Sequence, residues 1–217
     1  MTSRDIPDKL VIEPMREGDI PQVLEIEREA FSAAWSEGAY RRELRWNRLA
    51  RYLVLKEKPD VAQVSGAGDV PRNGGLGARL FSFLKRNPPA TTSNNLVRGY
   101  TGQWLMVDES HLLTIALHHE LRRRGLGEAL LIAAIDQAVE AGARIMTLEV
   151  RVSNLAAQAM YEKFGFWRVG LRPKYYTDND EDAVIMTSDI LASASFQSRL
   201  QRLKEESQKK VGVLWSR

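Results

Sequence analysis

The sequence contains no cysteine among its 217 residues. This absence excludes disulfides, thiolate metal sites and a cysteine nucleophile. No apolar run approaches the roughly 18 residues that a membrane-spanning helix needs. The first residues, MTSRDIPDKLVIEP, lack the apolar core of a signal peptide. We therefore expect a cytoplasmic protein that makes no membrane contact.

Neither sign of charge dominates the composition. The net charge is +3, with 31 basic and 28 acidic residues. An excess this small and this dispersed is typical of a solvated surface, and it argues against nucleic-acid binding. Hydrophobic residues make up 44% of the chain, which is enough to build the core of one soluble globular domain.

The most informative stretch is residues 112–130, LLTIALHHELRRRGLGEAL. An apolar, strand-like run ends in a basic turn with two glycines, and an amphipathic helix follows at once. A strand, a glycine turn and a helix N-terminus together present backbone N–H groups and the positive helix end to an anion. The stretch therefore predicts a site for a phosphorylated cofactor.

Two common phosphate motifs do not fit this stretch. A P-loop ends in Gly-Lys-Ser/Thr, which the sequence lacks. The dinucleotide motif G-x-G-x-x-G is matched by Gly125 and Gly127, but Leu130 stands where the third glycine belongs. Glu149 follows at about the 20-residue distance of a ribose-binding acid, yet a partial glycine motif is weak evidence. A nicotinamide or flavin site is therefore disfavoured.

Periodicity and turn residues predict an α/β domain with a mixed sheet. Strands are expected at 10–16, 51–56, 98–107, 111–117, 144–152, 166–174 and 183–188, and helices after Asp19, Ser36, Gly127 and Asn154. Residues 57–97 are rich in Gly, Pro, Asn and Ser, as is typical of an insertion that is partly mobile. Residues 191–217 form a tail in which Phe196, Leu200 and Leu203 at helical spacing predict a surface helix.

With these motifs, the chain resembles the GNAT superfamily of acetyl-CoA-dependent N-acetyltransferases over residues 9–190. The family's phosphate motif is Gln/Arg-x-x-Gly-x-Gly/Ala, and residues 122–127 fit it at every fixed position. Further segments are similar to the RimI-like branch, which acetylates protein N-termini. They are Ala30-Phe31-Ser32, Trp35-Ser36, Leu148-Glu149-Val150-Arg151, Ser153-Asn154, Met160-Tyr161-Glu162, Phe164-Gly165-Phe166 and Lys174-Tyr175-Tyr176.

The resemblance implies a GNAT fold, a mixed and mostly antiparallel sheet flanked by helices, and a role for each motif residue. Glu149 would be the general base and Tyr161 the general acid. Tyr175 and Tyr176, with Phe31 and Trp35, would line the substrate side. The acetyl-CoA contacts would come from Ile115, Ala116, Leu117, Arg122, Arg123, Arg124, Gly125, Leu126, Gly127 and Asn154.

Each of these residues also has a purely structural interpretation. Glu149 could pair with Arg151, two residues on and on the same strand face. Tyr161 could be an aromatic core residue, and Asn154 a plain helix N-cap, which is compatible with cofactor contact. His111, His118 and His119 show no ligand spacing with acids, so we expect no metal site.

The function predicted from these motifs is acetyl transfer from acetyl-CoA to the α-amino group of a protein N-terminus, such as that of a ribosomal protein, in a ternary complex. An α-amino group has a pKa near 8 and lysine one near 10.4, so deprotonation at neutral pH costs about 3 kcal/mol less at an N-terminus. Two alternatives stay open. They are a small-amine or lysine acetyltransferase on the same fold, and a non-catalytic acyl-CoA-binding module. The oligomeric state is not predicted.

Overall fold

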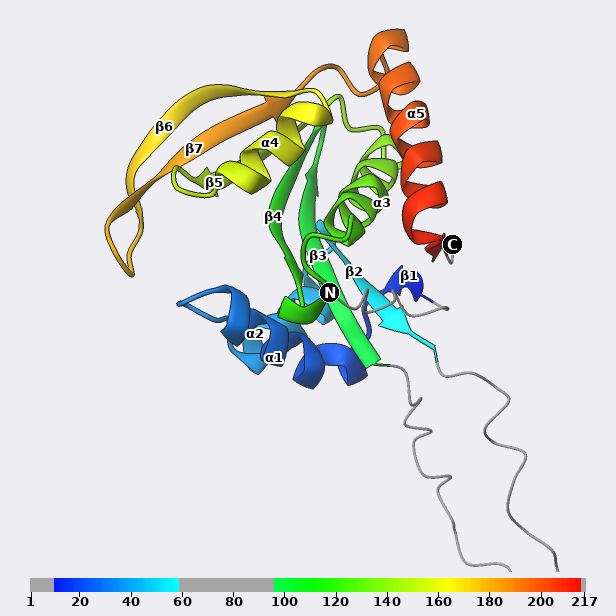
Figure 1. The fold of residues 1–217 in the computed structure, drawn as a ribbon. Coiled ribbons are helices and arrows are strands. Elements are labelled where there is room, and N and C mark those ends of the chain that lie inside the picture. The colour runs from blue at the N-terminus through cyan, green and yellow to red at the C-terminus, as the bar shows by residue number, and fades with distance from the viewer. Residues whose placement is uncertain (1–9, 59–95, 216–217) are drawn as a thin grey trace, which may run out of the picture.

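The computed structural model describes residues 10–58 and 96–215, so the expected insertion lies almost wholly outside the described residues. The helices and strands follow the order that the sequence predicts, the C-terminal helix included, and one short strand is added at the end (Figure 1). In chain order they are β1 (Leu10–Pro14), η1 (Glu17–Asp19), α1 (Ile20–Ala30), α2 (Glu37–Trp46), β2 (Ala50–Glu57), β3 (Leu96–Met106), β4 (Glu109–Leu117), η3 (His119–Leu121), α3 (Leu126–Glu140), β5 (Ile145–Arg151), α4 (Leu155–Lys163), β6 (Phe166–Tyr176), β7 (Glu181–Ser188), α5 (Ala194–Val211) and β8 (Leu214–Trp215).

Within the described residues the strands form one sheet in the order β6-β7-β5-β4-β3-β2-β1-β8. Most neighbours are antiparallel. The exceptions are β4 with β5, and β8 with β1. The prediction of a mixed, mostly antiparallel sheet is confirmed.

Helix starts follow local capping chemistry. The side chains of Ser36, Asn154 and Ser193 each accept a hydrogen bond from the backbone N–H three residues on, at the starts of α2, α4 and α5. Asp19 departs from this expectation, because its side chain makes no cap bond to α1. Its carboxylate instead accepts from Arg16 N at 2.9 Å and pairs with the buried Lys56 Nζ at 2.7 Å.

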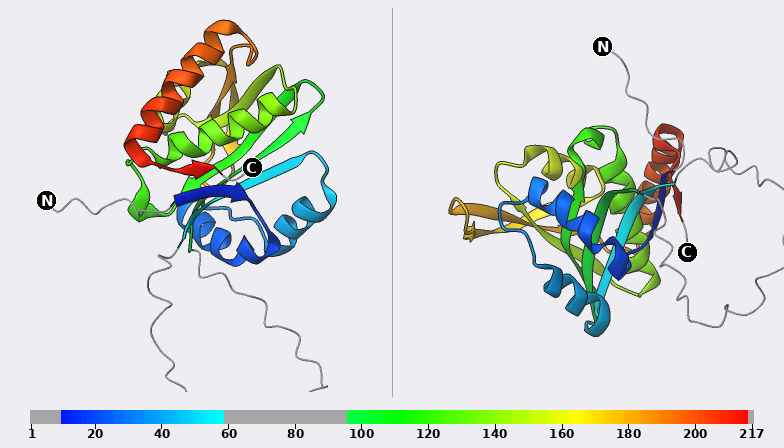
Figure 2. Two further views of the ribbon diagram at one scale, coloured as in Figure 1. Left: turned by 90° about the vertical axis from the view of Figure 1, so that its right-hand side faces the viewer. Right: turned by 90° about the horizontal axis from the view of Figure 1, so that it is seen from below.

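The sheet lies between two helical layers (Figure 2). The helices α1 and α2 pack on one face around Val23, Tyr40 and Tyr100. On the other face α3 is buried almost all round, and α4 and α5 pack beside it through residues such as Phe164 and Phe196. Among the described residues, no helix combines the length and apolar character needed to cross a membrane.

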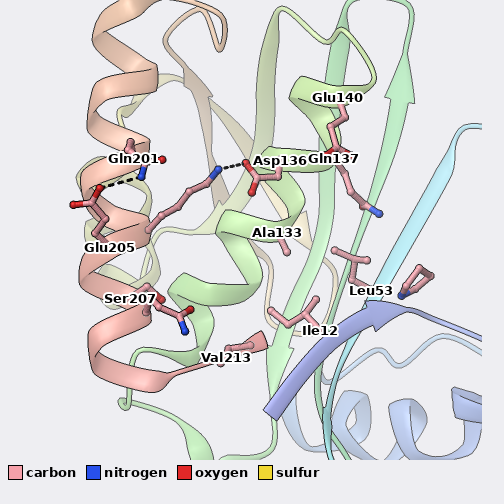
Figure 3. Close-up of a pocket in the computed structure, with 13 residues that line it drawn as sticks. Ile12, Leu53, Ala133, Asp136, Gln137, Glu140, Gln201, Glu205, Ser207 and Val213 are labelled. Carbon is pink, nitrogen blue, oxygen red and sulfur yellow. Dashed lines mark hydrogen bonds and ion pairs between the residues drawn. The ribbon is translucent and has the colours of Figure 1, made fainter. Parts of the chain in front are cut away.

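The C-terminal helix is an integral part of the second layer. Phe196, Leu200 and Leu203 each have at most 2% of their surface exposed. They form the apolar stripe that the sequence predicts. A cavity of about 620 Å³ opens between α5, α3 and strands β1 and β2, and the ion pair of Lys204 Nζ with Asp136 Oδ1, 2.6 Å long, lies at its wall (Figure 3). None of the site residues expected from the sequence lines this cavity.

Candidate active site

The central strands β4 and β5 pair at one end and separate at the other. Their parallel ladder runs from Glu109 opposite Ile145 to Leu112 opposite Leu148, and no further pair is formed. Residues 114–117 remain paired with β3 on their other side. The backbone edge of Ile115, Ala116 and Leu117 that faces β5 is therefore available to a ligand lying between the two strands.

The glycine turn lies between β4 and the start of α3. Arg123 and Gly125 have left-handed backbones, with φ of 66° and 92°, and Gly125 is the N-cap of α3. Arg122 Nε donates to Leu117 O at 3.2 Å, which ties the turn back to β4. A Cβ on Gly127 would meet only ordinary contacts with protein atoms. The turn lies at the positive end of α3, where backbone N–H groups can bind a phosphate.

Glu149 lies on β5 directly after the last residue paired with β4. Its Oε2 is 2.7 Å from His111 Nε2 and its Oε1 is 3.2 Å from Arg172, while its side chain is only 6% exposed. An ionised carboxylate only accepts, so His111 Nε2 carries the proton of this bond. The hydrogen bond from His111 holds the pKa of Glu149 below its usual range, although burial opposes the shift. The carboxylate is therefore charged at neutral pH.

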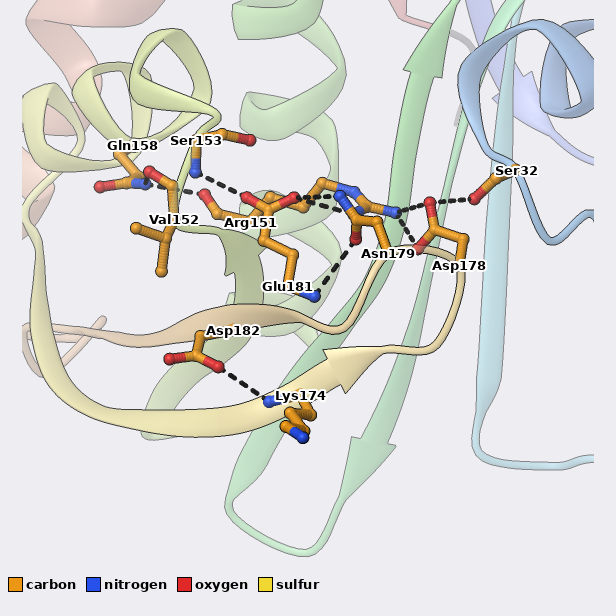
Figure 4. Close-up of polar contacts among 10 residues, drawn as sticks. All are labelled: Ser32, Arg151, Val152, Ser153, Gln158, Lys174, Asp178, Asn179, Glu181 and Asp182. Atoms are coloured by element: carbon orange, nitrogen blue, oxygen red, sulfur yellow. Dashed lines mark hydrogen bonds and ion pairs between the residues drawn. The ribbon is translucent and has the colours of Figure 1, made fainter.

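The structural interpretation in which Glu149 pairs with Arg151 is wrong. Arg151 pairs with Asp178 at 2.8 Å and with Glu181 at 2.9 Å (Figure 4). Glu181 also accepts from Ser153 N at 2.8 Å, and its pKa falls to about 2 through the hydrogen bonds from Ser153 and Arg151. This network joins the end of β5 to the β6–β7 turn, whereas Glu149 pairs with His111 and Arg172.

Tyr161 lies in the second turn of α4, on the opposite face of the sheet from Glu149. It packs with Leu148 and Val150 in the core shared by α3 and α4. Since successive strand side chains alternate between faces, Glu149 between those two residues points away from this core. Burial and the nearby Tyr176 raise the pKa of Tyr161, so its hydroxyl is protonated at neutral pH. The two candidate catalytic groups therefore lie on opposite faces of the sheet.

Asn154 has the structural role that the sequence allowed. It is the N-cap of α4, and its Oδ1 accepts from Ala157 N at 3.1 Å. This places it at the end of β5, close in sequence to the catalytic candidates. Contact with the cofactor stays a prediction.

The aromatic residues expected on the substrate side come from the α1–α2 loop and from the end of β6, next to the β6–β7 loop. Phe31 packs partly into the core beneath α1. The Trp35 ring is tilted against that of Tyr40, with 5.6 Å between the ring centroids, and 39% of the Trp35 surface is exposed. Tyr175 and Tyr176 contact each other edge to face near the end of β6. The two loops are joined where Ser32 Oγ donates to Asp178 at 2.6 Å (Figure 4).

The model of the acetyltransferase (GNAT) family matches residues 20–166, and this match includes the glycine turn, Glu149 and Tyr161. The chain belongs to the GNAT acetyltransferase family. GNAT enzymes use acetyl-CoA, and this chain is an acetyl-CoA-dependent N-acetyltransferase.

Similar proteins place this GNAT enzyme near one branch of the family. A Bacillus subtilis (strain 168) protein, provisionally named a ribosomal protein bS18-alanine N-acetyltransferase, is 34% identical over 178 residues, or 82% of this chain and 94% of that protein. The ribosomal protein bS18-alanine N-acetyltransferase of Escherichia coli K12 is 41% identical over 101 residues, covering 46% and 68%. The crystal structure of the ribosomal-protein-S18-alanine N-acetyltransferase from Escherichia coli gives a TM-score of 0.61 at 27% identity, covering 85% and 96%. The predicted GNAT fold and RimI-like resemblance are confirmed.

Sequence reasoning missed two contacts of this GNAT chain. The first is His111 beside Glu149, because the two residues meet only across neighbouring strands. The second joins Glu29 of α1 to the two histidines after β4. Glu29 lies 3.0 Å from His119 Nδ1 and 3.9 Å from His118 Nε2. Spacing along the chain gave no sign of either contact, since Glu29 lies some ninety positions before the histidines.

Proposed function

We propose that this GNAT enzyme transfers the acetyl group of acetyl-CoA to the α-amino group of a protein N-terminus by direct attack in a ternary complex. The observation that carries the chemistry is the opening between β4 and β5, with the charged Glu149 directly after the last paired residue on one face of the sheet and the protonated Tyr161 on the other face. Direct attack also agrees with the absence of any cysteine to hold an acyl group.

The glycine turn and β4 are the parts of the chain that would hold the cofactor. Backbone groups of Ile115–Leu117 would bind its pantetheine arm, and the turn from Arg122 to Gly127 its pyrophosphate. Asn154 would contact the arm from the start of α4. Acetyl-CoA, when bound, supplies a thioester whose acetyl carbon accepts the attacking amine.

Glu149 would prepare the amine for attack. Its carboxylate would take a proton from the α-ammonium group, directly or through one water, which leaves a neutral nucleophile. The hydrogen bond from His111 and the charge of Arg172 keep this carboxylate ionised and fixed in position. Because these contacts lower its basicity, the α-amino group, with a pKa near 8, is a more accessible substrate than lysine, near 10.4.

Tyr161 would act at the opposite face of the opening. Its hydroxyl would donate a proton to the departing thiolate sulfur, and its raised pKa keeps that proton in place until then. Among the described residues no hydrogen-bond partner is found for this hydroxyl, so the proton is not committed elsewhere.

Support for a protein N-terminus as substrate comes from the relatives, which are named for the alanine N-terminus of ribosomal protein bS18. Phe31, Trp35, Tyr175 and Tyr176 would line the mouth on the face of Glu149, where two loops meet at Ser32. The substrate protein would insert its N-terminus into this mouth as an extended peptide.

The test is initial-rate kinetics with three acceptors. They are a peptide with a free N-terminal alanine, the same peptide N-acetylated and carrying an internal lysine, and spermidine. We expect turnover of the free N-terminus only, with intersecting double-reciprocal lines for acetyl-CoA and peptide. Turnover confined to lysine or spermidine would contradict the N-terminal substrate. Parallel lines would contradict the ternary complex, and cofactor binding without turnover of any acceptor would indicate a non-catalytic module.

A further inference from the structure

The last turn of α5 brings a lysine to the glycine turn. Lys210 lies so close to Gly125 that a Cβ added there would be 3.1 Å from its Cδ, 3.2 Å from its Cε and 3.3 Å from its Nζ. Lys210 thus lies over the left-handed N-cap of α3. It belongs to the tail of the chain, outside residues 20–166 that match the family.

Buried residues that follow Lys210 hold it at this position. Val211 and Val213 are buried in the same cluster as Leu126, the first residue of α3. Gly212 ends α5 with a φ of 57°, and the chain then turns to pair as β8 with β1. The end of α5 is therefore fixed against the start of α3.

The acidic residues near Lys210 have other partners. Glu206, one turn earlier on α5, is paired with Arg202 at 3.3 Å. Arg122, Arg123 and Arg124 precede Gly125 in the turn. Glu128, the acid in the first turn of α3, is paired with Lys163 at 2.7 Å. Within the described residues no carboxylate lies within 4.0 Å of the Lys210 ammonium. Cations gathered at the positive end of a helix repel one another, and an anion bound among them relieves that repulsion.

A simpler explanation must be separated from this one. Lysines in the last turn of a helix are stabilised by the negative end of that same helix. Lys209 and Lys210 both lie in the last turn of α5. This explanation therefore applies equally to the two lysines, whereas contact with Gly125 is described for Lys210.

We propose that Lys210 is a phosphate-binding residue of the acetyl-CoA site, supplied by the C-terminal helix α5. The inference rests on the proposed position of the cofactor at the glycine turn. The ammonium would donate to phosphate oxygens of the cofactor, either those of the pyrophosphate or those of the 3′-phosphate.

Calorimetric dissociation constants test this proposal. We would titrate the full chain and the variants Lys210→Gln, Lys210→Arg and Lys209→Gln with acetyl-CoA and with 3′-dephospho-acetyl-CoA. Lys210→Gln should weaken acetyl-CoA binding about five- to tenfold, as expected for a partly exposed charge-assisted hydrogen bond. Lys210→Arg should retain most of the affinity, and Lys209→Gln should match the parent.

The second cofactor locates the phosphate. A defect seen only with acetyl-CoA would assign Lys210 to the 3′-phosphate, and an equal defect with both cofactors would assign it to the pyrophosphate. Equal affinities of Lys210→Gln and Lys209→Gln would overturn the proposal while leaving the proposed function intact. Failure of the parent to bind acetyl-CoA would instead contradict the cofactor site itself. Unfolding midpoints confirm that each variant is folded.

Discussion

Glu149→Gln is the substitution that most directly tests the proposed chemistry. It removes the charge and basicity of the carboxylate but keeps its size. The amide oxygen can still accept the hydrogen bond from His111, now 2.7 Å from Glu149 Oε2. The amide NH₂ then faces Arg172, whose side chain is 51% exposed and free to turn toward water. Loss of this screened ion pair should lower stability by about 1 kcal/mol or less.

The effect on the reaction should be much larger than the effect on the fold. A positioned general base contributes about 100- to 10,000-fold to rate, which corresponds to about 3–5 kcal/mol in the activation barrier. Since the glycine turn is untouched, the dissociation constant for acetyl-CoA should stay within about twofold of the parent, an energy difference below about 0.5 kcal/mol. The defect should also shrink as pH rises past about 8, where the α-amino group is already neutral.

Three measurements on the same preparation decide the result. They are kcat with an alanine-start peptide between pH 6 and 10, the calorimetric dissociation constant for acetyl-CoA, and the thermal midpoint. Glu57→Gln is the matched control, because Glu57 is a half-buried carboxylate paired with Arg98 at 2.6 Å on a distant strand. A fall in kcat of less than tenfold, or a comparable fall in the control, would refute Glu149 as the base.

Three further outcomes are expected. His111→Gln removes the strongest cause of the lowered pKa of Glu149, so that pKa should rise and the acidic limb of the kcat–pH profile should move to higher pH; an unmoved limb would show that Glu149 does not control it. Tyr161→Phe should lower kcat at least tenfold with an unchanged dissociation constant for acetyl-CoA, whereas equal loss of binding would indicate a packing role. Phe196→Ala should lower the free energy of unfolding in urea by about 3–5 kcal/mol, and a loss below about 1 kcal/mol would show that α5 is not part of the cooperative core.

Local chemistry explains why so much of the fold was predictable. Alternation, helical periodicity and turn residues identified the main elements, because each signal acts within a few residues. Asn154 is an example, because a helix N-cap forms its hydrogen bond within the first turn of its own helix. The basic glycine turn was recognisable for the same reason. The left-handed backbones at Arg123 and Gly125 fall within the stretch that the sequence marked for a phosphate.

What depends on strand register was not predictable. Arg151 was one structural partner considered for Glu149, but in the sheet it pairs with Asp178 and Glu181. The hydrogen-bond partner of Glu149 is His111, which lies 38 positions earlier in the sequence. The two residues meet only because β4 pairs with β5 in parallel. The two-residue strand β8 was likewise missed, because so short a strand exists only through its partner.

The pairing of β8 with β1 also determines which backbone groups are exposed at that end of the sheet. Without β8, strand β1 would present an open row of N–H and C=O groups, a template for pairing with another chain. The short β8 covers this edge opposite Val11 and Ile12. Strand β8 thus shields this part of the edge from pairing with another chain, and we expect its removal to favour self-association. Point substitutions, not deletions, are therefore the informative way to study α5.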